Sequence, residues 1–172
     1  VKAAVNNTMA IDKPSALKAK ATFGLAIQLP VKPMFEPWFN KFNKYNDKPK
    51  APKLKTSATL LKGATRNVDY VARLGGDEFA IIVARCNIQL LKNISERIIE
   101  SFACDKLLVR IRQNHGLTVS CSIGAAMHPL HGNTIQALLE ISDEQMYQAK
   151  KSGKNCYRIA GVSVPHVKSV SV

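Results

Sequence analysis

The sequence lacks the features of a membrane protein and of a disulfide-stabilised protein. No apolar run approaches the roughly 18 residues that a membrane-spanning helix needs, and the N-terminus has neither the charged nor the apolar region of a signal peptide. The four cysteines lie far apart and form no pair with metal-binding spacing, which favours reduced thiols over a zinc site or a disulfide framework. We therefore expect a cytoplasmic protein with no membrane segment.

Acidic residues are scarce. The chain has 12 Asp and Glu against 25 Lys and Arg, a net charge of +13, and residues 1–65 hold twelve lysines against three acids, a net of +9. This segment also contains five aromatic residues, Phe35, Trp38, Phe39, Phe42 and Tyr45. Basic residues interleaved with aromatics can bind single-stranded nucleic acid. The same aromatics suit a hydrophobic core, which we favour, and no nucleic acid partner is expected.

Proline should keep regular structure short at the start of the chain. Six of the eight prolines lie within the first 52 residues, and proline interrupts helices and sheet ladders. With 46% hydrophobic residues the chain can fill one core. We predict a single domain over residues 1–160, in which residues 1–65 are atypical, basic and proline-rich. A C-terminal tail should follow over residues 161–172.

Hydrophobic periodicity predicts helices and strands in the remainder. Apolar residues at spacings of three and four predict an amphipathic helix over residues 88–102. Apolar residues alternate with serines over residues 119–123, which predicts a half-buried strand. Residues 135–151 should be helical, in two pieces if Ser142 begins a capping box, with Gly153 as the stop. Together these elements predict an α+β fold.

The most informative stretch is Arg-Leu-Gly-Gly-Asp-Glu-Phe, residues 73–79. Residues 68–74 and 79–83 are strand-like runs on either side of a Gly-Gly pair. The favoured two-residue hairpin turns need positive φ angles, which glycine adopts readily. We therefore predict a hairpin with Gly75 and Gly76 in its turn.

Two adjacent carboxylates, Asp77 and Glu78, follow this turn. Neighbouring strand side chains point to opposite faces, so both can reach one ion only if the turn distorts the pleat. Hard oxygen ligands beside a glycine turn suit Mg²⁺ that carries substrate phosphates. An ordinary hairpin with exposed acids would have the same residues.

Residues 66–83 resemble the signature of the GGDEF family of bacterial diguanylate cyclases. Three further segments are similar to segments of the same family: Phe-Asn-Lys-Tyr-Asn-Asp (42–47), Leu-Thr-Val-Ser-Cys-Ser-Ile-Gly-Ala (117–125) and Ala-Lys-Lys-Ser-Gly-Lys-Asn (149–155). The resemblance is close from Arg66 to about Arg158 and poor before Arg66.

The resemblance implies a mainly antiparallel central sheet flanked by helices, similar to the palm of nucleotidyl cyclases. It implies a diguanylate cyclase that condenses two GTP into cyclic di-GMP and releases pyrophosphate, with Mg²⁺ or Mn²⁺ as cofactor. Each subunit of a homodimer would hold one GTP, since a lone subunit cannot close the ring. A fused or partner sensory domain would supply dimerisation.

Individual residues take their expected roles from the same resemblance. Asp77 and Glu78 match the family's metal-binding and catalytic acids. The substrate-binding positions match Gly75, Gly76, Asn46, Lys150 and Lys154, with the glycines and lysines at phosphate and the asparagine at the guanine edge. The two lysines could instead compensate the dipole at the end of a helix.

The chain departs from the family before Arg66. Trp38 stands where the first metal-binding aspartate belongs, and Asn40 where a second one belongs. A glycine- and histidine-containing turn that reads guanine is replaced by residues 48–53. Either the domain is a degenerate member that binds cyclic di-GMP or GTP without catalysis, or residues 1–65 are not those of a normal domain of the family.

A second site is expected from the Arg-x-x-Asp motif formed by Arg66 and Asp69. In the family this motif binds cyclic di-GMP as a feedback inhibitor, and Arg97 falls where some members add another arginine. Guanidinium groups pair with both phosphate and guanine acceptors. A surface salt bridge is the alternative explanation of the motif.

Overall fold

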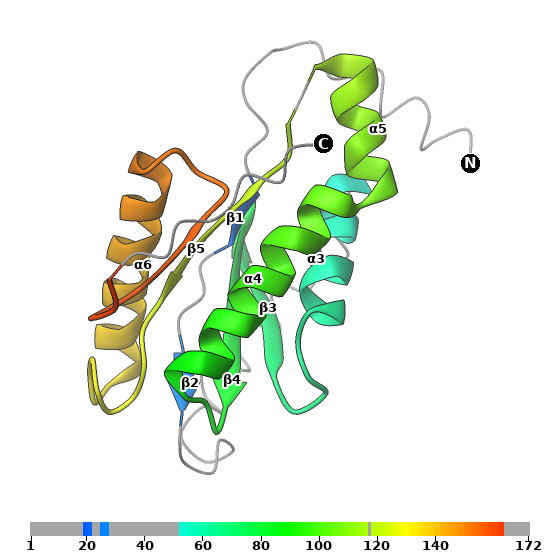
Figure 1. Cartoon of the computed structure of the whole chain (residues 1–172). Coiled ribbons are helices and arrows are strands. Elements are labelled where there is room, and N and C mark those ends of the chain that lie inside the picture. Colours follow the sequence, from blue (N-terminus) through cyan, green and yellow to red (C-terminus); the bar gives the residue numbers. More distant parts are fainter. Residues whose placement is uncertain (1–18, 22–24, 28–51, 117, 164–172) are drawn as a thin grey trace.

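The computed structural model describes residues 19–21, 25–27, 52–116 and 118–163 (Figure 1). The helices are α3 (Pro52–Gly63), α4 (Ile88–Cys104), α5 (Lys106–His115) and α6 (Ile135–Lys151). The strands are β1 (Ala19–Ala21), β2 (Leu25–Ile27), β3 (Tyr70–Gly75), β4 (Glu78–Ala84), β5 (Cys121–Ala125) and β6 (Tyr157–Ile159). Asn46 and Trp38, and with them the predictions for the guanine edge and the first metal ligand, lie outside the described residues.

One sheet of six strands lies at the centre of the fold. Its order is β2–β4–β1–β5–β6, and β3 pairs with β4 outside this path. The β3–β4 hairpin is antiparallel, whereas the other four described ladders are parallel. The α+β class is confirmed, and the antiparallel part of the described sheet is confined to the hairpin.

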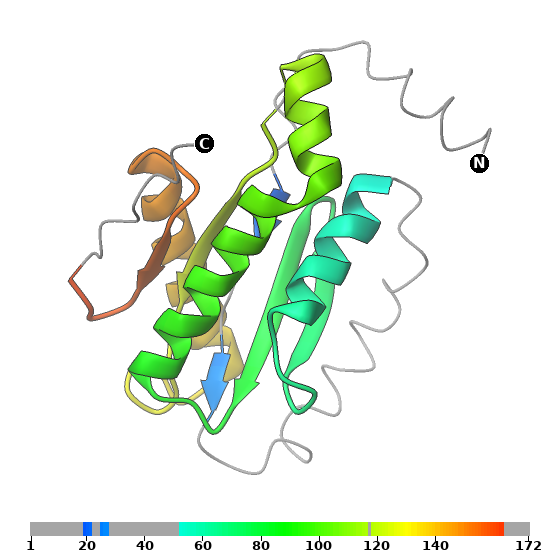
Figure 2. The ribbon, with the colours of Figure 1, turned by 45° about the vertical axis from the view of Figure 1, so that its right-hand side comes forward.

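Helices cover the sheet on both faces. The ribbon views place α3 and α4 side by side on one face and α6 on the other (Figures 1 and 2). Phe79, Ile81 and Val83 of β4 belong to the main core with the buried residues of α4, whereas Ile82 packs in a smaller cluster with Leu138 of α6. Alternate β4 residues therefore face what we call the α4 side and the α6 side.

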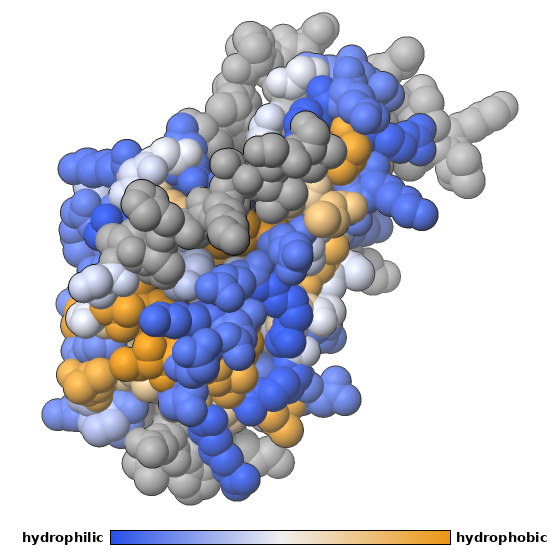
Figure 3. All heavy atoms as spheres, in the orientation of Figure 1, coloured by the Kyte–Doolittle hydropathy of each residue, from blue (hydrophilic) through white to orange (hydrophobic). Residues whose placement is uncertain are grey.

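The amphipathic helix predicted over residues 88–102 is confirmed as α4. Asn87 caps its start, with the side chain accepting a hydrogen bond from the backbone N–H of Leu90. Its buried stripe includes Leu91, Ile94 and Ile98. Hydrophilic residues run along the outward face of this helix (Figure 3).

Strand β5 is more deeply buried than predicted. The alternation with serines indicated a half-buried strand, but all five of its residues are buried. The expectation was wrong because α6 covers the face that the polar residues occupy. Ser122 is 4% exposed, and at Gly124 the backbone of α6 lies against the strand.

Helix α6 is one continuous helix, which corrects the prediction of two pieces. It begins at the cap Thr134, whose side chain accepts a hydrogen bond from Ala137 N–H. Ser142 lies inside the helix, where its hydroxyl donates to the carbonyl of Leu138 at 2.6 Å. The predicted stop agrees with the structure, because the helix ends before Gly153, which has φ +109°.

Helix α5 was not expected from the sequence. Asp105 caps it by accepting from Leu107 and Leu108 N–H, and Gly116 ends it in the left-handed conformation. The four cysteines are free thiols. None of the described helices is both long and apolar enough to cross a membrane.

Candidate active site

The turn of the β3–β4 hairpin is formed by Gly76 and Asp77, one residue later than predicted. Gly75 still belongs to β3 and pairs with Glu78. The register shifts between Arg73 and Gly75, which indicates a bulge that moves the turn along the chain. The bulge therefore distorts the pleat next to Asp77 and Glu78, which is the distortion that two adjacent carboxylates need in order to reach one ion.

The backbone conformation at position 76 favours glycine. Its φ is +51°, and no atom lies within 4 Å of the position that a Cβ would occupy. Arg73 stabilises the turn by donating hydrogen bonds from Nε at 3.0 Å and from Nη2 at 2.7 Å to the carbonyl of Gly76. Sequence reasoning missed this role, although an arginine three residues before the turn glycine was its signal.

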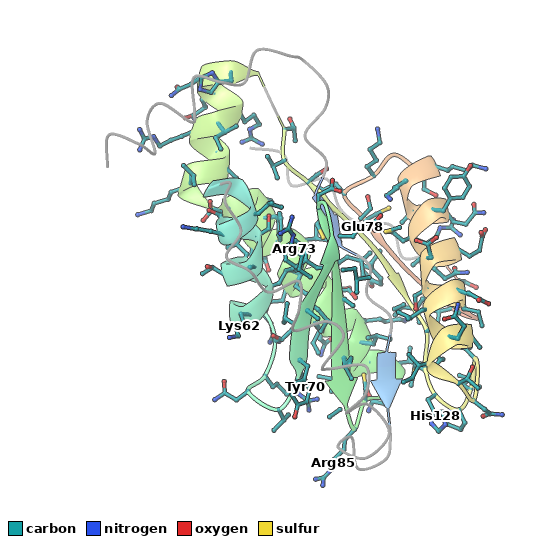
Figure 4. All side chains as sticks on the ribbon, turned by 180° about the vertical axis from the view of Figure 1, so that it is seen from behind. Lys62, Tyr70, Arg73, Glu78, Arg85 and His128 are labelled. Carbon is teal, nitrogen blue, oxygen red and sulfur yellow. The ribbon has the colours of Figure 1, made fainter. Side chains whose placement is uncertain are left out.

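Asp77 and Glu78 are both partly exposed at this turn. Strand alternation puts Glu78 on the side opposite Phe79, which is the α6 side. Glu78 is also the register partner of Lys20 in β1, so it lies toward the middle of the sheet (Figure 4). The hairpin thus delivers one carboxylate at the turn and one on the α6 side.

The end of α6 lies at the same end of the sheet as Glu78 (Figure 4). Lys150 is half-buried, one helical turn after the buried Met146, and it precedes the chain reversal into β6. Lys154 is exposed in that reversal with φ +64°, and its N–H donates to the carbonyl of Ala149 at 3.2 Å. The fold therefore brings both lysine positions to the end and the side where Glu78 lies.

The donor set suits a divalent cation that arrives with phosphates. The part of the chain that the structure describes contains no cluster of three His, Cys, Asp or Glu residues able to hold a metal alone. Mg²⁺ is commonly held by one or two carboxylates together with substrate phosphates. Asp77 and Glu78, beside the open space at Gly76, fit that requirement.

A second group of charged residues lies at the opposite end of the hairpin. Arg66 forms a two-pronged ion pair with Asp69, from Nη2 to Oδ1 at 2.8 Å and from Nε to Oδ2 at 3.0 Å. Asp69 Oδ2 also accepts from Arg66 N–H at 2.9 Å, and Oδ1 accepts from Ala84 N–H at 3.2 Å. Arg66 Nη2 donates in addition to the carbonyl of Ala84.

This pair is electrostatically coupled. Burial raises the pKa of Asp69, but the hydrogen bonds from Arg66 and Ala84 outweigh it and hold that pKa below its ordinary value. The hydrogen bond to Asp69 raises the pKa of Arg66. The side chain of Asp69 is 0% exposed, whereas that of Arg66 is 38% exposed.

The structure brings Arg97 to the same loop. From α4, its Nε and Nη2 donate to the carbonyl of Ala64 at 2.9 and 2.6 Å, two residues before Arg66. The three positions expected from the sequence to form a second site therefore meet around residues 64–69. They lie apart from the turn that carries Asp77, because β3 and β4 separate the two ends of the hairpin.

Known proteins of one family are similar to this chain in sequence. The family model described as diguanylate cyclase, GGDEF domain, matches residues 39–156. Diguanylate cyclase TpbB of Pseudomonas aeruginosa is 39% identical over 114 residues, covering 64% of this chain and 25% of that protein. Diguanylate cyclase DgcS of Shewanella oneidensis is 36% identical over 125 residues, covering 71% of this chain and 39% of that protein.

A solved structure has the same fold. The GGDEF domain of TpbB from Pseudomonas aeruginosa is 35% identical, with a TM-score of 0.54, and the match covers 70% of this chain and 72% of that one. This chain spans 25% of TpbB and 39% of DgcS, so it corresponds to one part of those proteins. The family match extends over more than half of the chain and includes the hairpin, Lys150 and Lys154. The chain belongs to the GGDEF domain family.

Proposed function

We propose that this domain is a diguanylate cyclase that condenses two GTP into cyclic di-GMP and releases pyrophosphate. The observation that carries the proposal is the hairpin turn, where Asp77 and Glu78 stand beside the open backbone of Gly76. The end of α6 at the same end of the sheet supports it (Figure 4). The similarity to the diguanylate cyclases TpbB and DgcS also supports the proposal.

The residues of the candidate site have separate roles in phosphoryl transfer. Asp77 and Glu78 would hold Mg²⁺ or Mn²⁺ together with the triphosphate, and the metal would supply positive charge that neutralises the phosphates. Gly75 and Gly76 let phosphate approach the backbone without meeting a Cβ. Lys150 and Lys154 place positive charge near the leaving pyrophosphate, and the family resemblance assigns the guanine edge to Asn46.

A second subunit completes the reaction. The product contains two phosphodiester bonds, and a domain that holds one GTP supplies one 3′-hydroxyl and one α-phosphate. Two domains facing each other supply both halves, so a homodimer is the expected catalytic form. A sensory domain in the same protein or in a partner would then control how often two domains meet.

Incubation with GTP and Mg²⁺, followed by chromatography for cyclic di-GMP, tests the proposal. Asp77→Asn should abolish product formation and leave the fold intact, because it removes ligand charge at an exposed turn. Asp143→Asn is the matched control, since Asp143 is an exposed carboxylate on the outer face of α6. Equal turnover by Asp77→Asn and wild type would contradict the metal role of Asp77.

The second candidate function is a non-catalytic module that binds cyclic di-GMP. The convergence of Arg66 and Arg97 on one loop supports it, and in a working cyclase the same loop would serve feedback inhibition. Arg66→Ala should weaken cyclic di-GMP binding by about 1.5–3 kcal/mol, the scale of a charged hydrogen bond, and leave GTP binding unchanged. A domain that binds cyclic di-GMP but makes none would identify the module. Equal loss of both ligands would show that the sites are not separate.

A further inference from the structure

Helix α5 projects beyond the end of the sheet (Figures 1 and 2). Leu108 is its one buried residue, and Ile111 packs partly against the main core. The other residues of the helix are exposed or half-exposed. The protein therefore holds α5 along one narrow stripe, and most of the surface of the helix faces outward.

The charged side chains of α5 have one sign. The helix contains Lys106, Arg110 and Arg112 and no Asp or Glu. The nearest acid along the chain is the cap Asp105, whose carboxylate accepts hydrogen bonds from the backbone of the helix. Leu107 lies three residues before Arg110, hence beside it on the helix surface, and is 40% exposed. A basic helix with an exposed leucine is typical of surfaces that bind anionic membranes.

Helix α6 has the opposite charge on its exposed surface. Three acids and one lysine, a net of −2, are exposed there: Glu140, Asp143, Glu144 and Lys151. α6 lies on the other face of the sheet from α4, which leads directly into α5 (Figure 1). An anionic surface therefore attracts the side of the molecule that carries α5 and repels the side that carries α6, which orients the domain.

We propose that α5 docks the domain on an anionic lipid bilayer, with its three cations at the headgroups and Leu107 at the boundary of the acyl chains. The domain lies on the bilayer without crossing it. Single-stranded nucleic acid suits α5 less well, because the helix contains no aromatic residue on which a base could stack. The inference is independent of the proposed catalysis, since none of these residues belongs to the candidate active site.

Sedimentation with lipid vesicles tests the inference on the whole chain. Wild type should bind vesicles of phosphatidylcholine mixed with phosphatidylglycerol but not vesicles of phosphatidylcholine alone, and binding should weaken as salt is added. Each cation near an anionic bilayer strengthens binding about fivefold, so Lys106→Gln/Arg110→Gln should bind about 25-fold more weakly. Failure of wild type to bind the anionic vesicles would overturn the inference.

The matched control removes two cations elsewhere. Lys62 and Arg85 are exposed and lie away from α5, toward the other end of the sheet (Figure 4). Lys62→Gln/Arg85→Gln has the same net charge as the α5 variant and should bind the anionic vesicles within about threefold of wild type. Equal losses in the two variants would show that net charge alone attracts the chain to the vesicles, and the inference would be wrong.

Leu107 provides a second readout. Leu107→Ser should weaken binding to the anionic vesicles by about fivefold, because the 40% of the side chain that is exposed could no longer be buried among acyl chains. Circular dichroism should show that all three variants are folded. Unchanged vesicle binding by Leu107→Ser would contradict docking through α5. If the α5 variant loses binding to a single-stranded oligonucleotide but keeps its binding to the vesicles, α5 is a nucleic-acid site and the inference is wrong.

Discussion

The packing of α6 on β5 gives the sharpest stability prediction, for Gly124→Ala. A Cβ at this position would lie 1.9 Å from the carbonyl oxygen of Ser142 and 2.2 Å from the nitrogen of Met146. Real Cβ contacts are essentially never under 3.0 Å, so the strand and helix must separate by about 1.1 Å, the difference between 3.0 and 1.9 Å. Both obstacles are backbone atoms of one helix, so no side-chain rotation can relieve the clash.

The cost follows from that geometry. Overpacking typically costs about 1–3 kcal/mol, and we expect the upper end because the whole of α6 must withdraw. For a chain of this size this corresponds to a fall of about 6–12 °C in the unfolding midpoint. Because Lys150 lies in the last turn of α6 and Lys154 in the reversal that follows it, GTP binding should weaken as well.

Urea and thermal unfolding, followed by circular dichroism, measure the effect. Gly63→Ala is the matched control, since no atom lies within 4 Å of its added Cβ, and its effect should stay within about 0.5 kcal/mol. A loss below about 1 kcal/mol for Gly124→Ala, with an unchanged denaturant slope, would refute the reasoning, because α6 could then not be packed on β5 as described.

Three further predictions concern single side chains. Because the pKa of Asp69 is lowered in the folded state, its contribution to the free energy of unfolding is present above about pH 4 and is lost as the pH falls through the folded pKa. The urea midpoint of wild type should therefore drop in acid more steeply than that of Asp69→Asn. Parallel pH profiles of the two proteins would contradict this. Burial raises the pKa of the Cys86 thiol to about 11, so iodoacetamide at pH 8 should label the exposed Cys104 before Cys86. Mass spectrometry measures the two labelling rates, and equal rates would show that Cys86 is not buried as described. Tyr157→Phe removes the 2.8 Å hydrogen bond to Glu96 and should lower the free energy of unfolding, measured in urea, by about 0.5–1.5 kcal/mol. An unchanged free energy of unfolding would mean that this hydrogen bond adds no net stability.

Local patterns predicted the elements well where periodicity was strong. The stripe of α4 and the strand runs around Gly75 and Gly76 were recognised from spacings of three to four and of two. The turn was misplaced by one residue because the bulge before Gly75 depends on the paired strand. Helix α5 was not recognised, because most of its residues are polar or exposed and it buries only Leu108.

The candidate site was predicted as a set of residue types but not as an arrangement. The two carboxylates and the glycines follow from the signature itself. Their position relative to Lys150 depends on α6 lying on one particular side of the sheet, which the contact at Gly124 fixes. No spacing along the chain carries that information, since the two segments are far apart in sequence.

The sequence by itself determined the family, through the resemblance of residues 66–83 to the signature of that family. It also determined the hairpin with its carboxylates and the main helix, because these depend on short-range periodicity and on backbone angles that glycine permits. Only the tertiary structure decided which faces are covered and which polar groups are already satisfied. Helices α4 and α6 bury β5 on both sides, and the carboxylate of Asp69 accepts a hydrogen bond from the backbone N–H of Ala84. Burial and hydrogen-bond partners come from residues distant in the chain, so the folded structure alone distinguishes a side chain that can meet a ligand from one that holds the protein together.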